Sequence, residues 1–291
     1  MSFKEHALKY SINRPLQIAG AGNHSMLIFA PTSVDILDLA HQLIEMMPKL
    51  TQREQNQLTA VYGSKQTTRP LRVVTPKTTL QELTGGGQQP NPGELSYAHT
   101  GILILKNIEQ FKKNWLQMIR DVLFDGKVTF TRASQAVTYP AAPLIIASVP
   151  ACQCDNWGDK NKTCTCTPEQ RADYSSKFTS ETYPFLQLTM LMDTQWHRRI
   201  EFKKNESKIA CAKKHQNERF GNTLPGNASL TQSQITEFCP YDEQGRDVQR
   251  FKDHNPDLWP TTLKLARTIA DLKNEADINA NHITEAYSWR A

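Results

Sequence analysis

The chain has 291 residues, of which 38% are hydrophobic and 22% charged, and its formal net charge is +5 at pH 7. These values are typical of a soluble folded protein of one or two domains, and the charge alone does not indicate a nucleic-acid partner. The sequence contains no apolar run near the roughly 20 residues that cross a bilayer, and no apolar core follows the charges at the amino terminus. We therefore expect a cytoplasmic protein without membrane insertion.

The first two thirds of the chain predict an α/β fold with a parallel sheet. Three short apolar runs are typical of strands that are covered on both faces, and they lie at 24–30, 101–105 and 143–149. Helical patterns alternate with them at 34–47 and 111–124. Residues 124–130 predict the end of a helix, a turn at Gly126 and a further strand. The glycines 85–87, with the prolines and glycine after them, predict a long structured loop before the second apolar run.

After about residue 195 the pattern predicts helices only. The expected helices are 205–219, 231–250, 259–273 and 280–289, with Thr231 and Asn279 as start signals. We therefore predict an α/β domain over 1–195, which includes a cysteine-rich excursion at 150–168. A helical region over 196–291 is expected to follow it.

Residues 22–40 have the spacing of a phosphate-binding loop, G-x-x-x-x-G-K-[ST], but not its chemistry. Such a loop uses glycines to expose backbone N–H groups, a lysine for the phosphates and a hydroxyl for Mg²⁺. The residues at those four positions are Ala30, Asp35, Ile36 and Leu37. Asp35 also places negative charge at a helix start, where the helix dipole otherwise favours phosphate. The sequence therefore predicts that the chain works without ATP.

Four of the six cysteines form a cluster with metal-ligand character. Cys152 and Cys154 form one C-x-C pair, and Cys164 and Cys166 form another. Four thiolates suit tetrahedral Zn²⁺, and a closed site of this kind is structural. Four reduced thiols, or two disulfides formed on isolation, are the alternatives that the spacing leaves open. Cys211 and Cys239 fall on expected helices, where we interpret them as ordinary core residues.

Several segments together resemble the magnesium-chelatase-like AAA+ family, in the branch that contains competence-associated DNA helicases. The matching segments are 18–24, 85–87, 92–99, 125–129, 152–168, 237–239 and 266–272. The register holds from about residue 14 to residue 290. The resemblance implies an AAA+-like sheet domain followed by a helical lid. It does not extend to the protease-like domain that precedes the ATPase module in that branch, which we expect this chain to lack.

The positions that handle ATP in that family carry other residues here. Lys106 and Asn107 stand where an acidic pair would hold Mg²⁺, and Pro150 stands at the polar sensor. Within 180–185, Phe185 takes the place of the trans-acting arginine, and Asp257 takes the place of the arginine of the lid. Phosphoryl transfer depends on positioning and on cations that offset the charge of the phosphates. We therefore expect a pseudoenzyme in which the nucleotide site is degenerate.

A basic stretch and two histidines complete the candidates. Residues 197–219 carry eight lysines and arginines and two histidines, against three glutamates. Such a stretch is a solvated helix face or a contact for phosphates or an acidic protein surface, and we favour the first. His24 and His99 are interpreted as satisfied core or loop residues.

The resemblance leaves two classes of function. The first is an inactive AAA+-like scaffold within a larger bacterial machine, such as a secretion or conjugation coupling complex or a ring with an active ATPase. Its partners would be other protein subunits, with a homo-oligomer as an open alternative, and a membrane-associated complex could recruit it. Lys106 and Phe185 are the expected contact residues. The second class is a DNA-processing accessory that binds DNA without hydrolysing ATP, which we favour less.

Overall fold

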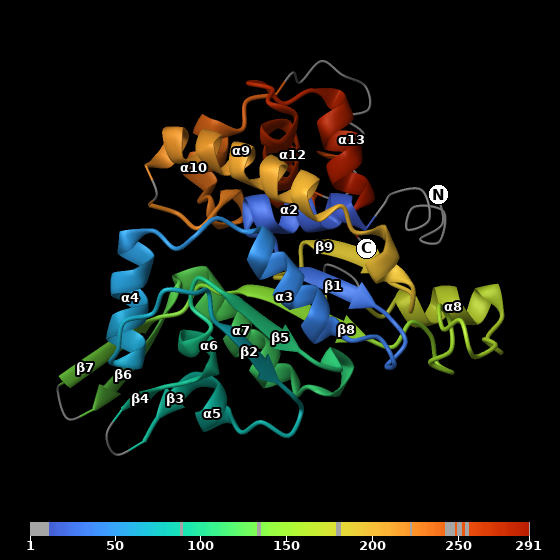
Figure 1. Ribbon diagram of the computed structural model, residues 1–291, viewed down its shortest axis with the longest axis horizontal. Helices are drawn as coiled ribbons and strands as arrows, with labels where there is room; N and C mark the ends of the chain where they lie inside the picture. Colours follow the sequence, from blue (N-terminus) through green and yellow to red (C-terminus); the bar gives the residue numbers. More distant parts are fainter. Residues whose placement is uncertain are drawn as a thin grey trace. The chain divides into compact units, whose positions relative to one another are not determined.

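The computed structural model describes residues 12–87, 90–132, 135–178, 182–221, 223–241, 248, 252–253 and 256–290 (Figure 1). Its strands are β1 (Met26–Phe29), β2 (Leu71–Val74), β3 (Gly85–Gly86), β4 (Asn91–Pro92), β5 (Ile102–Leu105), β6 (Lys127–Arg132), β7 (Gln135–Pro140), β8 (Leu144–Val149) and β9 (Leu188–Leu191). Its helices of the first 175 residues are α2 (Asn13–Gly22), α3 (Ile36–Met46), α4 (Gln52–Tyr62), α5 (Leu80–Thr84), α6 (Glu94–Tyr97), η1 (Ile108–Gln110), α7 (Lys113–Asp125) and α8 (Pro168–Ser175). The later helices are η2 (Trp196–Arg199), α9 (Phe202–Phe220), η3 (Asn227–Ser229), α10 (Gln232–Phe238), η4 (Pro256–Leu258), α12 (Trp259–Lys273) and α13 (Ala280–Ser288).

Five strands form one sheet in the order β2-β5-β8-β1-β9. The pairs β1–β9, β2–β5 and β5–β8 are parallel. Every residue of β1, β5 and β8 is buried, which is why these strands consist almost entirely of apolar residues. The predicted α/β class with a parallel sheet is confirmed, and helices alone follow η2 in the described residues.

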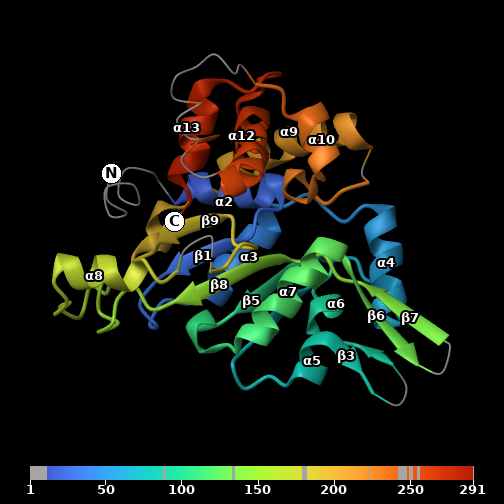
Figure 2. The same cartoon turned by 180° about the vertical axis from the view of Figure 1, so that it is seen from behind.

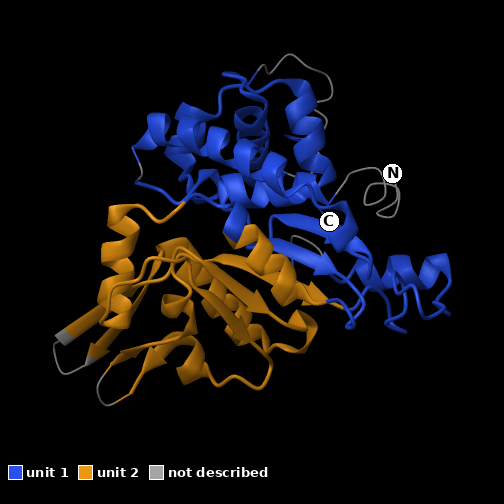
Figure 3. Cartoon of the chain, viewed as in Figure 1, with its two compact units in different colours: residues 1–34, 45–48, 150–291 blue, residues 35–44, 49–149 orange. Residues whose placement is uncertain are grey.

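The chain divides into two compact units (Figure 3). The first comprises residues 1–34, 45–48 and 150–291, and the second comprises 35–44 and 49–149. The boundary near residue 195 that the sequence pattern suggests stays a prediction.

The first unit is organised around buried helices. Helix α2 packs against α9 and α12, and α12 packs against α13. A buried ion network fixes this bundle: Arg219 and Arg267 both pair with Asp271, at 2.6 Å and 3.1 Å. Arg267 also donates to the carbonyl oxygens of Glu275 and Ala276. All the donors of a buried guanidinium need such partners, because an unpaired one would carry a large desolvation cost.

The second unit combines β2, β5 and β8 with two hairpins. Figure 2 shows α7 lying across these strands. Helix α7 ends at Asp125, and the φ of 67° at Gly126, the next residue, lets the chain turn into the antiparallel hairpin of β6 and β7. The second hairpin, of β3 and β4, depends on a close backbone approach. A Cβ on Gly85 would lie 2.2 Å from the carbonyl oxygen of Asn91.

Among the described residues, no helix has both the length and the apolar character needed to cross a membrane.

Candidate metal centre and degenerate phosphate loop

The four clustered cysteines converge in the first unit. Cys152 lies shortly after the end of β8, and Cys166 lies just before α8. The sulfur of Cys152 lies 3.3 Å from that of Cys154 and 3.7 Å from that of Cys164, and all four sulfurs lie within 4.8 Å of one another. In a tetrahedral site with Zn–S bonds of about 2.3 Å, the sulfurs stand about 3.8 Å apart. The four cysteines lie close enough together to bind a metal.

The sulfurs of the cluster differ in how readily they ionise. Burial raises the pKa of the Cys152 thiol to about 12, and its hydrogen bond with Cys154 adds to the shift. Burial also opposes ionisation of Cys154, but the N–H groups of Asn156 and Thr165 donate to its sulfur and lower its pKa to about 5. The cluster thus holds a thiolate beside a thiol, and the remaining protons must leave when a metal binds.

Arg171 of α8 supplies positive charge beside the sulfurs. Its guanidinium donates to the carbonyl oxygen of Cys166 at 2.6 Å and lies 3.8 Å from the sulfur of Cys164. It also stacks over the ring of Trp157, 5.1 Å from the ring centroid. A dication held by four thiolates leaves a net charge of −2, which the guanidinium partly offsets. The sequence pattern did not single out this arginine, because it lies five residues beyond the last cysteine.

The degenerate phosphate loop divides between the end of β1 and the start of α3. Ala30 is buried directly after β1 in the first unit. In the second unit, Ile36 is only 5% exposed at the lysine position, and Leu37 is half-buried at the hydroxyl position. The carboxylate of Asp35 accepts from the N–H of Leu37 at 2.9 Å. Asp35 therefore caps α3 with an internal negative charge.

Two further carboxylates meet the residues just after β1. Asp155 accepts from the backbone N–H of Thr32 at 3.0 Å and from its hydroxyl. Asp159 accepts from the hydroxyl of Ser33 at 2.9 Å. Both aspartates lie in the excursion between the two cysteine pairs. The two partners of each contact are 123 and 126 positions apart in the sequence. No short-range pattern connects residues so far apart, so the sequence analysis missed these two contacts.

The other positions at which the family's ATP-handling residues are replaced differ in their exposure. Lys106 is exposed after β5, and Asn107 takes a left-handed φ of 57°. Pro150 and Phe185 are half-buried, and Asp257 is exposed. Residues 180–181 of the arginine-bearing motif lie outside the described residues.

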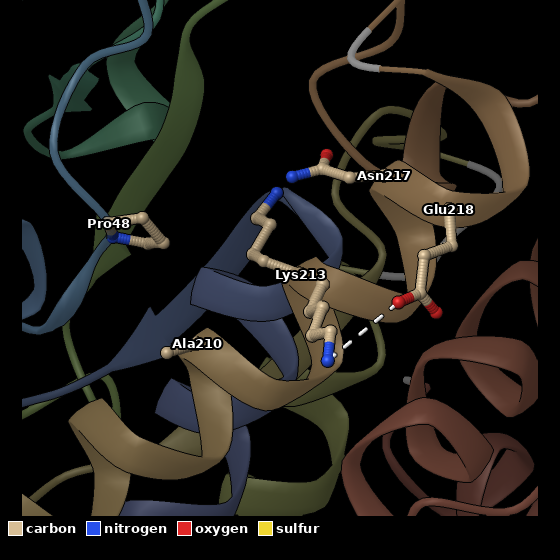
Figure 4. Close-up of a pocket in the computed structure, with 6 residues that line it drawn as sticks. Pro48, Ala210, Lys213, Asn217 and Glu218 are labelled. Carbon is tan, nitrogen blue, oxygen red and sulfur yellow. Dashed lines mark ion pairs between the residues drawn. The ribbon is translucent and has the colours of Figure 1, made fainter.

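The basic stretch forms η2 and α9, and several of its charges are paired. Lys204 pairs with Glu201, and Lys214 lies 3.9 Å from Glu218. Lys213 instead donates to the carbonyl oxygen of Pro225. Two of these lysines border an open hollow of about 400 Å³ (Figure 4), which is lined by Pro48, Ala210, Lys213, Lys214, Asn217 and Glu218. The paired lysines agree with a solvated helix face.

Among the remaining candidates, one expectation is corrected and three are confirmed. Cys239 is buried as predicted, but Cys211 is exposed on α9, so its assignment to the core was wrong. The sequence pattern predicted the helix but not that Cys211 lies outside the buried face of α9. His24 is fully buried and bonded to Gln187 and Thr268. His99 is buried and accepts from the N–H of Ala142.

The parallel sheet followed by a helical domain is that of an AAA+-like protein. The family described as "Magnesium chelatase, subunit ChlI" matches residues 4–199, and "Magnesium chelatase, subunit ChlI C-terminal" matches residues 203–290. The chain therefore belongs to the magnesium chelatase subunit ChlI family, as the sequence resemblance predicted.

Two curated relatives illustrate the range of the family. An "Uncharacterized protein YifB" of Salmonella typhimurium is 28% identical over 302 residues, and the "Competence protein ComM" of Haemophilus influenzae is 27% identical over 300 residues. Each match covers 96% of this chain but 58% of the relative. The chain thus spans less than two thirds of the length of these proteins.

Proposed function

We propose that this chain is a catalytically inactive member of its family, which neither binds nor hydrolyses ATP at a useful level and acts through contacts with other protein subunits. The observation that carries the proposal is Ile36, which is buried at the position of the phosphate-binding lysine. An apolar side chain packed in the interior cannot offset phosphate charge. Lys106 and Asn107 offer no carboxylate for Mg²⁺, and a bound nucleotide needs both kinds of group.

We also propose that Cys152, Cys154, Cys164 and Cys166 hold one structural Zn²⁺. The sulfur spacings and the guanidinium of Arg171 support this assignment. A site with four protein ligands has no open position for a substrate, so its contribution is to the fold.

The contact surfaces of the proposed scaffold include Lys106 in the second unit and Phe185 in the first. Lys106 is exposed and Phe185 is half-buried, so both are accessible to a partner. Aromatic side chains are enriched among the residues that dominate binding energy at interfaces. Candidate assemblies are a secretion or conjugation coupling complex, a homo-oligomer, or a ring with an active ATPase.

The double variant K106E/F185A tests this placement. We expect recovery of co-purifying proteins from the native cell to fall by about tenfold, a loss typical of a truncated aromatic anchor. The thermal midpoint should move by no more than about 4 °C, because neither side chain is fully buried.

The matched control is K127E/F124A, which changes an exposed lysine and a phenylalanine that is 90% exposed. This control should recover every partner at the wild-type level. If K106E/F185A also does so, the interaction surface lies elsewhere and the placement is wrong.

A second candidate function is a DNA-processing accessory role. It is favoured by the printed name of the relative ComM, a competence protein, and by exposed lysines such as Lys203 on α9. Binding to DNA would weaken steeply with salt, because each neutralised phosphate releases counterions. A salt titration with duplex and single-stranded DNA distinguishes the two functions. An affinity that falls by a large power of the salt concentration supports the accessory role, and negligible binding supports the scaffold.

A further inference from the structure

The residues just after β1 have hydrogen-bond donors like those that a phosphate loop offers to its ligand. They are the N–H and hydroxyl of Thr32 and the hydroxyl of Ser33. All three donate to carboxylates of the same chain, at Asp155 and Asp159. Both carboxylate oxygens of Asp155 accept a hydrogen bond from the Thr32 N–H, with N···O distances of 3.0 Å and 3.3 Å. An internal anion therefore occupies this loop.

The cysteine excursion determines where these carboxylates lie. Asp155 follows Cys154 directly, has a left-handed φ of 59°, and donates its N–H to the carbonyl oxygen of Cys152 at 3.0 Å. The turn made by the first cysteine pair therefore aims the Asp155 carboxylate. Asp159 is 9% exposed, and its other oxygen accepts from the N–H of Asn161 at 2.9 Å.

The two ends of the excursion meet at the sulfurs, through the side-chain amide of Asn156, which donates to the carbonyl oxygen of Thr163, and through Arg171, which stacks over Trp157. Cys154 lies 3.6 Å from Cys164, and Arg171 joins the second pair through the carbonyl oxygen of Cys166. A metal at the sulfurs would close residues 152–166 into one loop.

We propose that the cysteine excursion is a metal-dependent latch on the residual phosphate loop. With metal bound, the excursion holds Asp155 and Asp159 on Thr32 and Ser33. When the metal leaves, the excursion loosens and the donors of Thr32 and Ser33 lose their carboxylate partners. The latch rests on the zinc site of the proposed function, and it adds a consequence that a purely structural metal does not have.

Hydrogen exchange at the Thr32 amide tests the latch. In the zinc-loaded full chain this amide should exchange slowly, and removal of zinc with a chelator should speed its exchange by about tenfold, as expected for loss of a hydrogen bond to a charged group. The variant D155A, with zinc still bound, should exchange at the fast rate and show no further change on chelation. D173A, which removes an exposed aspartate of α8, should behave like the wild type.

Zinc content, measured on each sample, separates the two proposals. If the wild type holds zinc but Thr32 exchanges equally fast with and without it, the latch is wrong and the metal site stands. If D155A holds zinc and still protects Thr32, the latch is also wrong. If the wild type binds no zinc at all, both proposals fail. D155A also keeps every cysteine, so its zinc content reports directly whether the excursion still folds.

Discussion

His24 shows at the scale of one residue how this scaffold fixes a polar group. Its ring lies 2.5 Å from the amide oxygen of Gln187 and 2.8 Å from the hydroxyl of Thr268. Gly22 must lack a side chain because a Cβ there would lie 2.2 Å from the His24 ring. Burial lowers the pKa of His24 to about 3, although the bond to Gln187 raises it and Lys264 lowers it further. His24 is therefore neutral in the fold at pH 7.

This pKa predicts acid destabilisation. A histidine with its ordinary pKa of 6.5 takes up a proton in the unfolded chain as the pH falls below that value, whereas the folded one does not until about pH 3. The contribution to stability is therefore complete above pH 6.5 and falls by up to about 1.4 kcal/mol per pH unit below it. Urea unfolding at pH 7.5, 6 and 5 should show a shallower dependence in H24Q than in the wild type.

The matched control for His24 is H41Q, which changes an exposed histidine of α3. It should keep the wild-type dependence on pH. An H24Q variant with the same dependence as the wild type would show that His24 does not titrate on unfolding as described.

At the scale of elements, the hydrophobic pattern of the sequence predicted those strands and helices whose burial follows a regular local pattern. The apolar runs at 101–105 and 143–149 became β5 and β8, and the pattern at 259–273 became α12. Strands β2 and β9 were missed, because their burial is mixed and they lack a continuous apolar run. The expected helix at 231–250 is interrupted: α10 ends at Phe238, residues 239–241 are not helical, and residue 248 is helical again. Residues 242–247 lie outside the described part.

The candidate site divides in the same way. The two C-x-C pairs were enough to predict the cluster of four sulfurs, because the cysteines of each pair lie close together in the sequence. The contacts of Asp155 with Thr32 and of Arg171 with Trp157 depend on how the chain folds back on itself. No periodicity encodes such contacts, so they needed the structure.

The cysteine excursion should carry one zinc. Elemental analysis of protein purified without chelator should find about one zinc per chain. The variant C152S/C154S should lose it, and C211S, which changes an exposed cysteine of α9, should retain it. The zinc should also leave progressively at acidic pH, since protons compete for the thiolates. Metal-free wild-type protein with four freely titratable thiols would contradict the assignment.

At the scale of the whole molecule, the family matches span almost the whole chain, from residue 4 to 199 and from 203 to 290. The fold of the family is thus retained, while the residues at the phosphate-loop positions are apolar or acidic. Asp35 and Asp155 both place carboxylates on N–H groups near that loop, at Leu37 and Thr32. The proposed function rests on this combination of a family fold with apolar and acidic residues at the phosphate-loop positions.

Isothermal titration calorimetry with Mg·ATP tests the central claim most directly. The wild-type chain, loaded with zinc, should give no binding heat, because Ile36 and Leu37 supply neither an ammonium nor a metal-binding hydroxyl. The variant I36K should stay equally silent, since Lys106 and Asn107 still offer no carboxylate to Mg²⁺. A saturable isotherm for the wild type with a Kd in the low micromolar range would contradict the account.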